Sequence, residues 1–150
     1  MLREAFSNVY MKFKLHFYQK VFERLMDREA TLTTVETFCM EIIYALGRPT
    51  VAEFAHMANI SSPNAAYKIN NLVKKGYLRK VQSETDKREY YLEVTEKYLN
   101  YYNISYNYMD RVMDRIEKRF SEEEIAELVK ILEITADELM TEIQLKTDEK

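Results

Sequence analysis

The chain has 150 residues, 47% of them hydrophobic and 31% charged, with a formal net charge of −3, as in an ordinary soluble subunit with a real core. A single cysteine, Cys39, excludes an internal disulfide framework, and no signal peptide or membrane-length apolar run is found, so the expected location is the cytoplasm. Two glycines and two prolines predict long helices with short connections and exclude a Gly-rich phosphate loop.

Two helices are predicted ahead of residue 50. The first covers residues 4–29, where apolar side chains recur at spacings of three or four. Thr33 and Glu36 have the spacing of a capping box, which indicates where the second helix begins. That helix should end at Gly47.

Two shorter helices joined by a tight turn are predicted next. Thr50 and Glu53 form another capping box, in which each side chain should bond the other residue's amide. The turn falls at residues 59–60, with Ile60 as a buried plug between the helices. Ser61 is a good N-cap for the following helix, and Gly76 suits the left-handed residue that ends it.

The outward face of the helix after Ser61 is the candidate reader of DNA bases. Asparagine can pair with adenine through two hydrogen bonds, and lysine can donate to guanine or to phosphate. The predicted major-groove residues are Ser62, Asn64, Tyr67, Lys68 and Asn71. The predicted phosphate contacts are Lys74, Lys75, Arg79 and Lys80.

A β-hairpin with a charged tip is predicted after this helix. Residues 78–83 and 89–94 read as strands, joined by a loop that holds Asp86, Lys87 and Arg88. Arg88 is placed to enter a minor groove, whose negative potential attracts a guanidinium. Asp86 can hold Arg88 in an extended pose through a charge-assisted bond.

Two more helices are predicted after the hairpin. Thr95 can cap a helix of more than twenty residues, and Ser121 with Glu124 forms a third capping box that starts the last helix. The longer helix has a heptad-like seam made of Tyr98, Tyr102, Ser105, Met109, Val112 and Ile116. So much apolar surface exceeds what one small lobe can cover, which predicts a homodimer built on the first helix and the last two.

The charge is distributed unevenly along the chain. Residues 61–88 hold seven cations and two anions, a net charge of +5, whereas residues 121–150 hold three cations and ten anions, a net charge of −7. Such an asymmetry concentrates attraction for DNA on one surface while the rest of the body repels it.

The segments NISSPNAAYKINNLVKKGYL and SETDKREYYLEVT resemble the MarR family of bacterial winged helix–turn–helix regulators. The resemblance implies a mainly α fold with a small β-wing. Residues 31–94 would form the DNA-binding winged lobe, residues 1–30 and 95–145 the dimerisation helices, and residues 146–150 a frayed tail. Many members have Thr-Arg where this chain has Ala66-Tyr67.

The resemblance also implies a small-molecule effector pocket between the dimerisation helices and the winged lobe. The candidate lining residues are Phe13, Phe17, Met40, Tyr44, Tyr101 and Tyr108, each of which could instead serve core or dimer packing. Cys39 is expected to be a small buried hydrophobe, His16 to be partly packed and His56 exposed. No cofactor or metal site is expected, because neither histidine has a second ligand at metal-binding spacing.

The leading hypothesis is a homodimeric transcriptional regulator, acting as a repressor, that binds a pseudo-palindromic operator in double-stranded DNA. The alternative is a winged-helix module that binds another protein and does not read DNA. An enzyme is not expected, because no nucleophile–base pair or carboxylate pair can be placed in a shared cleft. No membrane partner is expected either.

Overall fold

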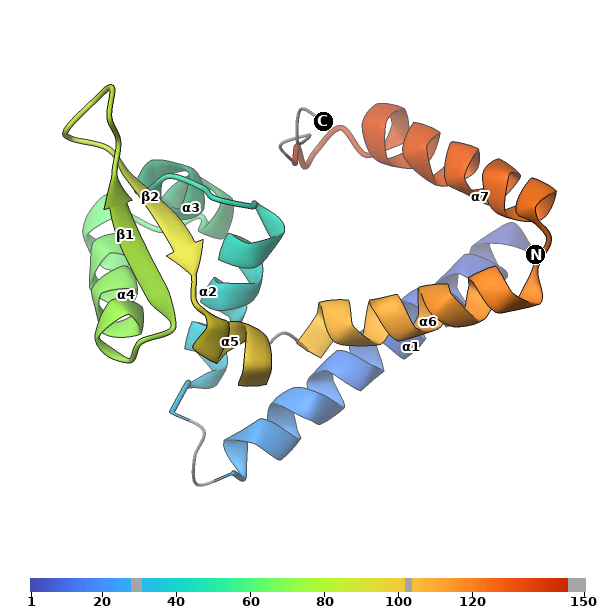
Figure 1. Cartoon of the computed structure of the whole chain (residues 1–150), viewed down its shortest axis with the longest axis horizontal. Helices are drawn as coiled ribbons and strands as arrows, with labels where there is room; N and C mark the ends of the chain where they lie inside the picture. The colour runs from blue at the N-terminus through green and yellow to red at the C-terminus, as the bar shows by residue number, and fades with distance from the viewer. Residues whose placement is uncertain (28–30, 102–103, 146–150) are drawn as a thin grey trace. The chain divides into compact units, whose positions relative to one another are not determined.

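The computed structural model describes residues 1–27, 31–101 and 104–145, without the side chains of residues 101, 104 and 105. The chain divides into two compact units, Met1–Ile104 and Ser105–Lys150. Figure 1 labels the helices and strands along the chain. In the parts of the chain that the structure describes, no helix is long and apolar enough to cross a membrane.

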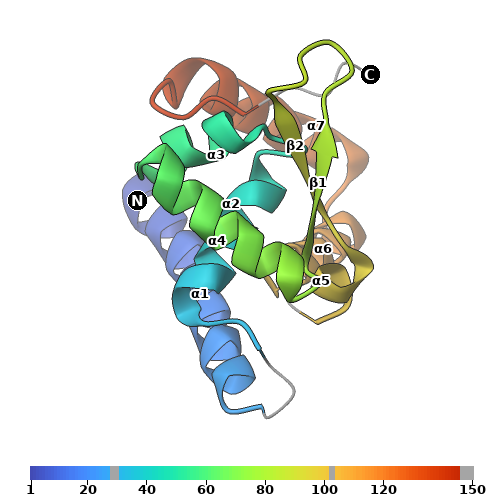
Figure 2. The same ribbon diagram turned by 90° about the vertical axis from the view of Figure 1, so that its left-hand side faces the viewer.

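The first unit contains five helices and one hairpin within its described residues. In chain order they are α1 (Leu2–Leu25), α2 (Thr34–Ala45), α3 (Val51–Ala58), α4 (Ser62–Lys74), β1 (Leu78–Gln82), β2 (Tyr90–Val94) and α5 (Glu96–Tyr101). Helices α2, α3 and α4 pack against one another and against the hairpin (Figure 2). The predicted helix–turn–helix with a wing is therefore confirmed.

The helices begin where short polar side chains satisfy their first amides. Thr33 and Glu36 form the complete predicted capping box of α2. At α3 the prediction was half right: the Glu53 amide donates to the Thr50 hydroxyl at 3.1 Å, but the Glu53 carboxylate accepts from that hydroxyl at 3.2 Å rather than from the backbone. Ser61 caps α4 as predicted.

Left-handed residues end the two helices of the helix–turn–helix. Asn59, at φ 54°, closes α3, and Gly76, at φ +82°, follows the last turn of α4. The predicted plug, Ile60, is half-buried and packs against the core. These turns set the direction in which α4 leaves α3 and in which β1 leaves α4.

The core of the first unit lies among α2, α3, α4 and the hairpin. Its fully buried side chains include Met40, Phe54, Ile69, Leu72 and Leu92. Cys39 belongs to this core, as predicted, and burial raises the pKa of its thiol. His56 is exposed and His16 is half-buried, which confirms both expectations.

Two buried tyrosines of the core contact residues outside it through their hydroxyl groups. Tyr98 donates to the Glu41 carboxylate at 2.8 Å, and the Tyr77 hydroxyl lies 2.9 Å from that of Thr31. The sequence predicts Tyr98 at the start of the helical seam, but no part of its surface is exposed. It belongs to the winged core because α5 packs there.

The strands pair antiparallel from Leu78↔Val94 to Gln82↔Tyr90, one residue shorter at the loop end than predicted. An isolated bridge between Thr50 and Tyr91 ties β2 to the start of α3. This bridge fixes the hairpin beside the helix–turn–helix.

Helix α1 exposes most of its apolar side chains. Only Val21 is buried in it, whereas Phe6, Tyr10, Leu15 and Phe22 are exposed. The helix ends at Leu25, earlier than the predicted residue 29, and residues 28–30 lie outside the described part.

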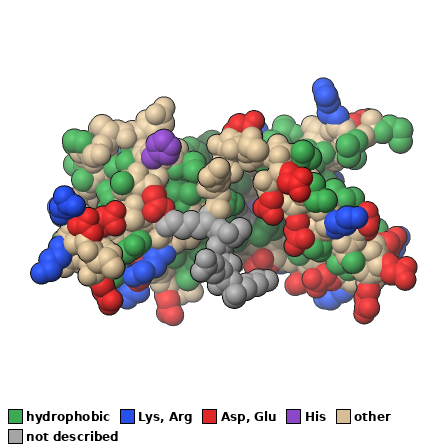
Figure 3. Space-filling model, turned by 90° about the horizontal axis from the view of Figure 1, so that it is seen from above, with side chains coloured by type: hydrophobic (Ala, Val, Ile, Leu, Met, Phe, Trp, Pro, Cys, Tyr) green, Lys and Arg blue, Asp and Glu red, His purple; other side chains and the backbone are tan. Residues whose placement is uncertain are grey.

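The second unit begins at Ser105, one residue after the start of α6. Its elements are α6 (Ile104–Arg119), α7 (Glu122–Ile134) and a π-helical turn, η1 (Thr135–Leu139). Ser121 and Glu124 form the complete capping box predicted for α7. No residue of α7 is buried, and its first turn holds three glutamates; acidic side chains are visible on the surface in Figure 3.

The predicted helix of more than twenty residues after Thr95 stays a prediction, because residues 102–103 lie outside the described part between α5 and α6. The Thr95 hydroxyl itself donates to the Gly76 carbonyl at 2.7 Å, so it bonds the end of α4. Residues 146–150, the predicted frayed tail, also lie outside the described part.

Candidate nucleic-acid interface

One face of α4 packs on the core and the opposite face is open. Ala65, Ile69 and Leu72 are fully buried on the inner face. Among the predicted major-groove residues, Ser62, Asn64 and Tyr67 are exposed, and Lys68 and Asn71 are half-buried. Tyr67 retains 67% of its surface, which makes it the most exposed large hydrophobic side chain of this helix.

Asn70 is an exposed residue of this face that the sequence-based set did not include. It lies three residues after Tyr67, and residues three or four apart are neighbours on a helix surface. The same spacing relates Tyr67 to Asn64 and Asn71. The outward face therefore contains three asparagines around one tyrosine, and helical spacing alone would have included Asn70.

The wing tip is held by a pair of charged residues, as predicted. Asp86 accepts hydrogen bonds from the Arg88 backbone amide at 3.0 Å and from the Arg88 guanidinium at 3.2 Å to each carboxylate oxygen. These bonds from Arg88 lower the pKa of Asp86. The Arg88 side chain is nonetheless 91% exposed, so it is oriented without being covered.

Further bonds define the loop around this pair. The Ser83 hydroxyl accepts from the amides of Thr85 and Asp86, both at 3.3 Å. The Gln82 side chain donates to the Lys87 carbonyl at 2.9 Å, while the Lys87 side chain is exposed. The tip is therefore a hydrogen-bonded turn that presents Lys87 and Arg88.

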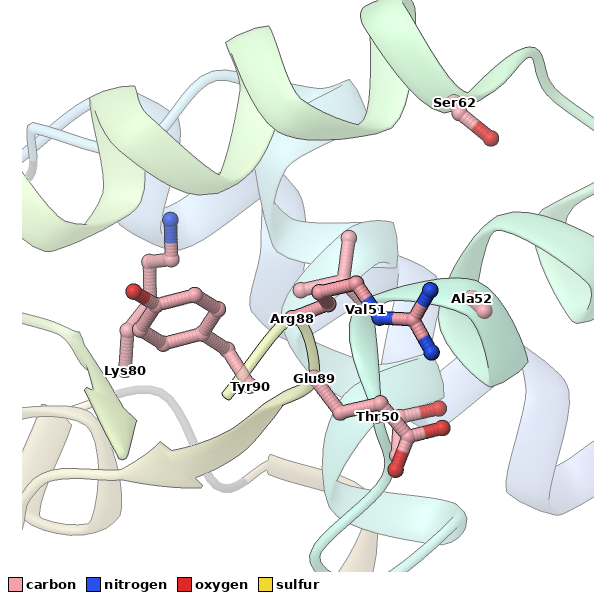
Figure 4. Close-up of a pocket in the computed structure, with 8 residues that line it drawn as sticks. All are labelled: Thr50, Val51, Ala52, Ser62, Lys80, Arg88, Glu89 and Tyr90. Atoms are coloured by element: carbon pink, nitrogen blue, oxygen red, sulfur yellow. The ribbon is translucent and has the colours of Figure 1, made fainter. Parts of the chain in front are cut away.

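A groove of about 290 Å³ lies between the wing and the first turns of α3 and α4 (Figure 4). Lys80 and Tyr90 line it from the wing, with the Lys80 ammonium 4.8 Å from the ring centre of Tyr90. Ser62 lines it from α4. The complete lining is Thr50, Val51, Ala52, Ser62, Lys80, Arg88, Glu89 and Tyr90.

The four predicted phosphate contacts lie in different environments. Lys74 and Lys80 are exposed. Lys75 is engaged inside the lobe, where its ammonium lies 2.8 Å from both the Glu36 carboxylate and the Thr31 carbonyl.

Arg79 lies on the opposite face of the wing from Lys80, because successive side chains of a strand alternate. It lies opposite Glu93 in the strand register, and its guanidinium is 3.3 Å from the Glu93 carboxylate. Arg48 binds the same carboxylate at 2.8 Å and stacks over Tyr91. The structure therefore brings Lys80 and Arg88 to one groove and places Arg79 elsewhere.

The predicted effector pocket stays a prediction. Phe17 packs near Phe38, with ring centres 6.2 Å apart, and Tyr44 lies near Tyr98 at 6.1 Å. Phe13 is half-buried and Met40 is completely buried. The side chain of Tyr101 lies outside the described residues, and Tyr108 belongs to the second unit.

Comparison with known proteins adds to this geometry. Residues 32–90 match the model of the MarR family. No curated protein sequence matches the chain significantly.

Solved structures share the fold over nearly the whole chain. FabT from Streptococcus pneumoniae in complex with DNA is 22% identical, with a TM-score of 0.61, over 95% of this chain and 97% of its own. A MarR protein from Peptoclostridium difficile is 23% identical, with a TM-score of 0.52, over 94% and 88%. A mutant of S. aureus MepR bound to an oligodeoxyribonucleotide is 17% identical, with a TM-score of 0.51, over 93% and 99%.

The matched segment contains the helix–turn–helix, β1 and the wing loop described above, and the whole chain has the fold of MarR-type transcription regulators. Residues 32–90 are therefore similar to the MarR family of winged helix–turn–helix proteins, and the likeness of the chain as a whole to the solved structures is one of fold.

Proposed function

We propose that the protein is a sequence-specific regulator of transcription that binds double-stranded DNA as a homodimer. One observation carries this proposal. The same unit exposes a polar face on α4 and, on its wing, an Arg88 side chain that is held in a fixed orientation. FabT and a MepR mutant, both similar in fold, were solved with DNA bound.

In the proposed complex α4 enters the major groove. Asn64, Tyr67 and Asn71 would face base edges, because the residues of a recognition helix that point away from the core meet the bases. Lys80 would neutralise a phosphate beside the groove, and Arg88 would enter the adjacent minor groove. Lys74, Lys68 and Ser62 would lie at the edges of this interface.

The proposed homodimer rests on apolar surface that each unit leaves exposed. Helix α1 exposes Phe6, Tyr10 and Phe22, and α7 exposes Ile131 and Leu132. Covering such surface with a second copy releases water and stabilises the pair. A two-fold dimer would present its two α4 helices to half-sites roughly 34 Å apart.

The finer part of the proposal is that the protein acts in the cytoplasm as a repressor and that a small-molecule effector releases it from DNA. An effector bound between the dimerisation helices and the winged lobes would change the separation of the two α4 helices. If the separation of the two α4 helices no longer matches the spacing of the half-sites, both helices cannot bind at once and the dimer loses affinity for DNA.

Selection of bound fragments from random duplex DNA tests the central claim. A dimeric reader should enrich sequences with two-fold symmetry, and its affinity should fall with salt at a log–log slope of about −0.9 per neutralised phosphate. Arg88→Ala should weaken binding about tenfold, whereas Arg48→Ala, on the far face of the wing, should leave it unchanged.

Three outcomes would each overturn the proposal or one part of it. A chain that enriches no duplex and binds independently of salt would fit the alternative, a winged-helix module that binds protein. Sedimentation equilibrium that shows only monomer at micromolar concentration would refute the homodimer. Equal effects of the two arginine substitutions would refute the wing's role in DNA binding.

A further inference from the structure

We propose that α4 reads A·T base pairs, with its asparagines pairing to adenine and Tyr67 contacting the methyl group of thymine. This inference rests on the proposed DNA-binding function and goes beyond it by naming the bases that the helix selects. It is carried by the composition and exposure of the outward face of α4.

The outward face lacks the residue that most often reads guanine. Arginine and lysine donate to the O6 and N7 acceptors of guanine, and arginine is the commonest partner. Helix α4 has the sequence SPNAAYKINNLVK and contains no arginine. Its two lysines lie away from the middle of the face, since Lys68 is half-buried and Lys74 is in the last turn.

Three asparagines occupy the positions around Tyr67. A carboxamide presents one donor group and one acceptor, which match N7 and the N6 amino group of adenine. Asn64 uses its backbone amide in the cap with Ser61 at 3.3 Å, and its carboxamide has no hydrogen bond within the described residues. Asn70 is exposed, and Asn71 is half-exposed next to it.

Tyr67 lies between these asparagines, one helical turn from each. The residue is 67% exposed, and its ring packs against no other aromatic ring in the described parts of the chain. The thymine C5 methyl is the apolar group that base pairs display in the major groove. An exposed aromatic ring in the middle of a reading face is therefore complementary to thymine and has no counterpart on a G·C pair.

The wing favours the same base composition. A·T tracts have a narrow minor groove with an enhanced negative potential, and this attracts an inserted arginine. Asp86 holds Arg88 in an extended pose while leaving it 91% exposed. Both grooves would thus select A·T pairs, the major groove through α4 and the flanking minor groove through Arg88.

The test begins with duplexes enriched from a random library by the full-length protein. Each thymine in the enriched half-site is replaced in turn by deoxyuridine, which removes the methyl group and keeps base pairing. At one position per half-site, wild-type affinity should fall about fourfold, as for the loss of one buried methyl contact. Tyr67→Ala should bind more weakly, and the same replacement should then have no effect.

Tyr67→Phe is the matched variant, because it keeps the ring and should keep the sensitivity to deoxyuridine. Adenines are tested with 7-deazaadenine, which lacks N7; the loss should be about fivefold for the wild type and absent in Asn64→Ala at the contacted base. Tyr67 and Asn64 are exposed and do not belong to the buried core, so the variants should melt at the wild-type temperature.

Enrichment of G·C-rich half-sites would overturn the base assignment and leave DNA binding intact. So would equal deoxyuridine effects in the wild type and Tyr67→Ala. If no duplex is enriched, the proposed function fails as well, so the two failures are distinguishable.

Discussion

The Lys75 ammonium lies 2.8 Å from the Glu36 carboxylate, so an ion pair connects the end of α4 to the first turn of α2. Lys75 also donates to the Thr31 carbonyl, and Lys97 donates to the Lys75 carbonyl at 2.7 Å. The Glu36 side chain is only 12% exposed, and its second oxygen is buried with no hydrogen-bond partner among the described residues. The proposed recognition helix is therefore fixed at its end by long-range polar contacts.

Replacing Lys75 with methionine should lower the free energy of unfolding by about 1–3 kcal/mol, because a mostly buried carboxylate would lose its charged partner. Lys74→Met is the matched control: Lys74 is the neighbouring residue and is exposed. Its effect should stay within about 0.5 kcal/mol. Urea unfolding at one fixed protein concentration measures both. Equal effects of the two substitutions would show that the ion pair adds no stability.

Acid should weaken the same contact. Burial disfavours the charged form of Glu36, but the bonds from Lys75 and Thr33 outweigh it, so the pKa of Glu36 lies below its ordinary value of 4.5. A lowered pKa means that the contribution to stability is complete above pH 4.5 and is lost as the pH falls below it. When unfolding is measured from pH 6 downward, the free energy of unfolding should decline less steeply below pH 4.5 in Glu36→Gln and Lys75→Met than in the wild type. An unchanged slope in Glu36→Gln would contradict this assignment.

Arg79 and Lys80 should differ in their effect on DNA binding although they are adjacent. Lys80→Ala should reduce the magnitude of the salt slope by about 1.8 for the proposed dimer, because each of its two Lys80 side chains lines the groove beside α4 and would neutralise one phosphate, at about 0.9 each. Arg79→Ala should keep the wild-type slope, because its guanidinium pairs with Glu93 on the other face of the wing. Fluorescence anisotropy over a range of salt concentrations separates the two. A matching loss of slope in both variants would place both side chains on DNA.

Asp86→Asn should weaken DNA binding about three- to tenfold, because Arg88 would lose the charged partner that orients its guanidinium. Glu84→Gln, in the same loop, also removes one negative charge but has no such bond to Arg88. Less repulsion from phosphate should leave its affinity equal or slightly higher. Both substitutions remove one negative charge. If only Asp86→Asn weakens DNA binding, the loss comes from the orientation of the Arg88 guanidinium and not from the change in net charge. Tighter binding by Asp86→Asn would instead mean that bulk charge dominates.

The sequence predicted features that depend on neighbouring residues. The caps at Thr33, Ser61 and Ser121 and the left-handed Gly76 were correct, since each uses bonds or backbone angles within one helical turn. The pairing of Asp86 with Arg88 was correct for the same reason.

Positions that depend on distant partners were not predictable in this way. The sequence predicts Lys75 as a phosphate contact, but it could not show that Lys75 pairs with Glu36, which lies 39 residues earlier. Tyr98 fitted a helical seam, yet it is buried because α5 packs on a core built mainly by earlier residues. Arg79 is an intermediate case, because strand alternation would have separated it from Lys80 once the register was known.

The division of α4 into a packed face and an open face has an evolutionary consequence. Ala65, Ile69 and Leu72 hold the helix in place, while Tyr67 lies outside the core that they help to form. If α4 reads DNA as proposed, substitutions at Tyr67 should change which DNA sites are bound at almost no cost in folding free energy. After gene duplication, a copy of such a protein could acquire a new set of target genes through one or two surface substitutions, without compensating changes in its interior.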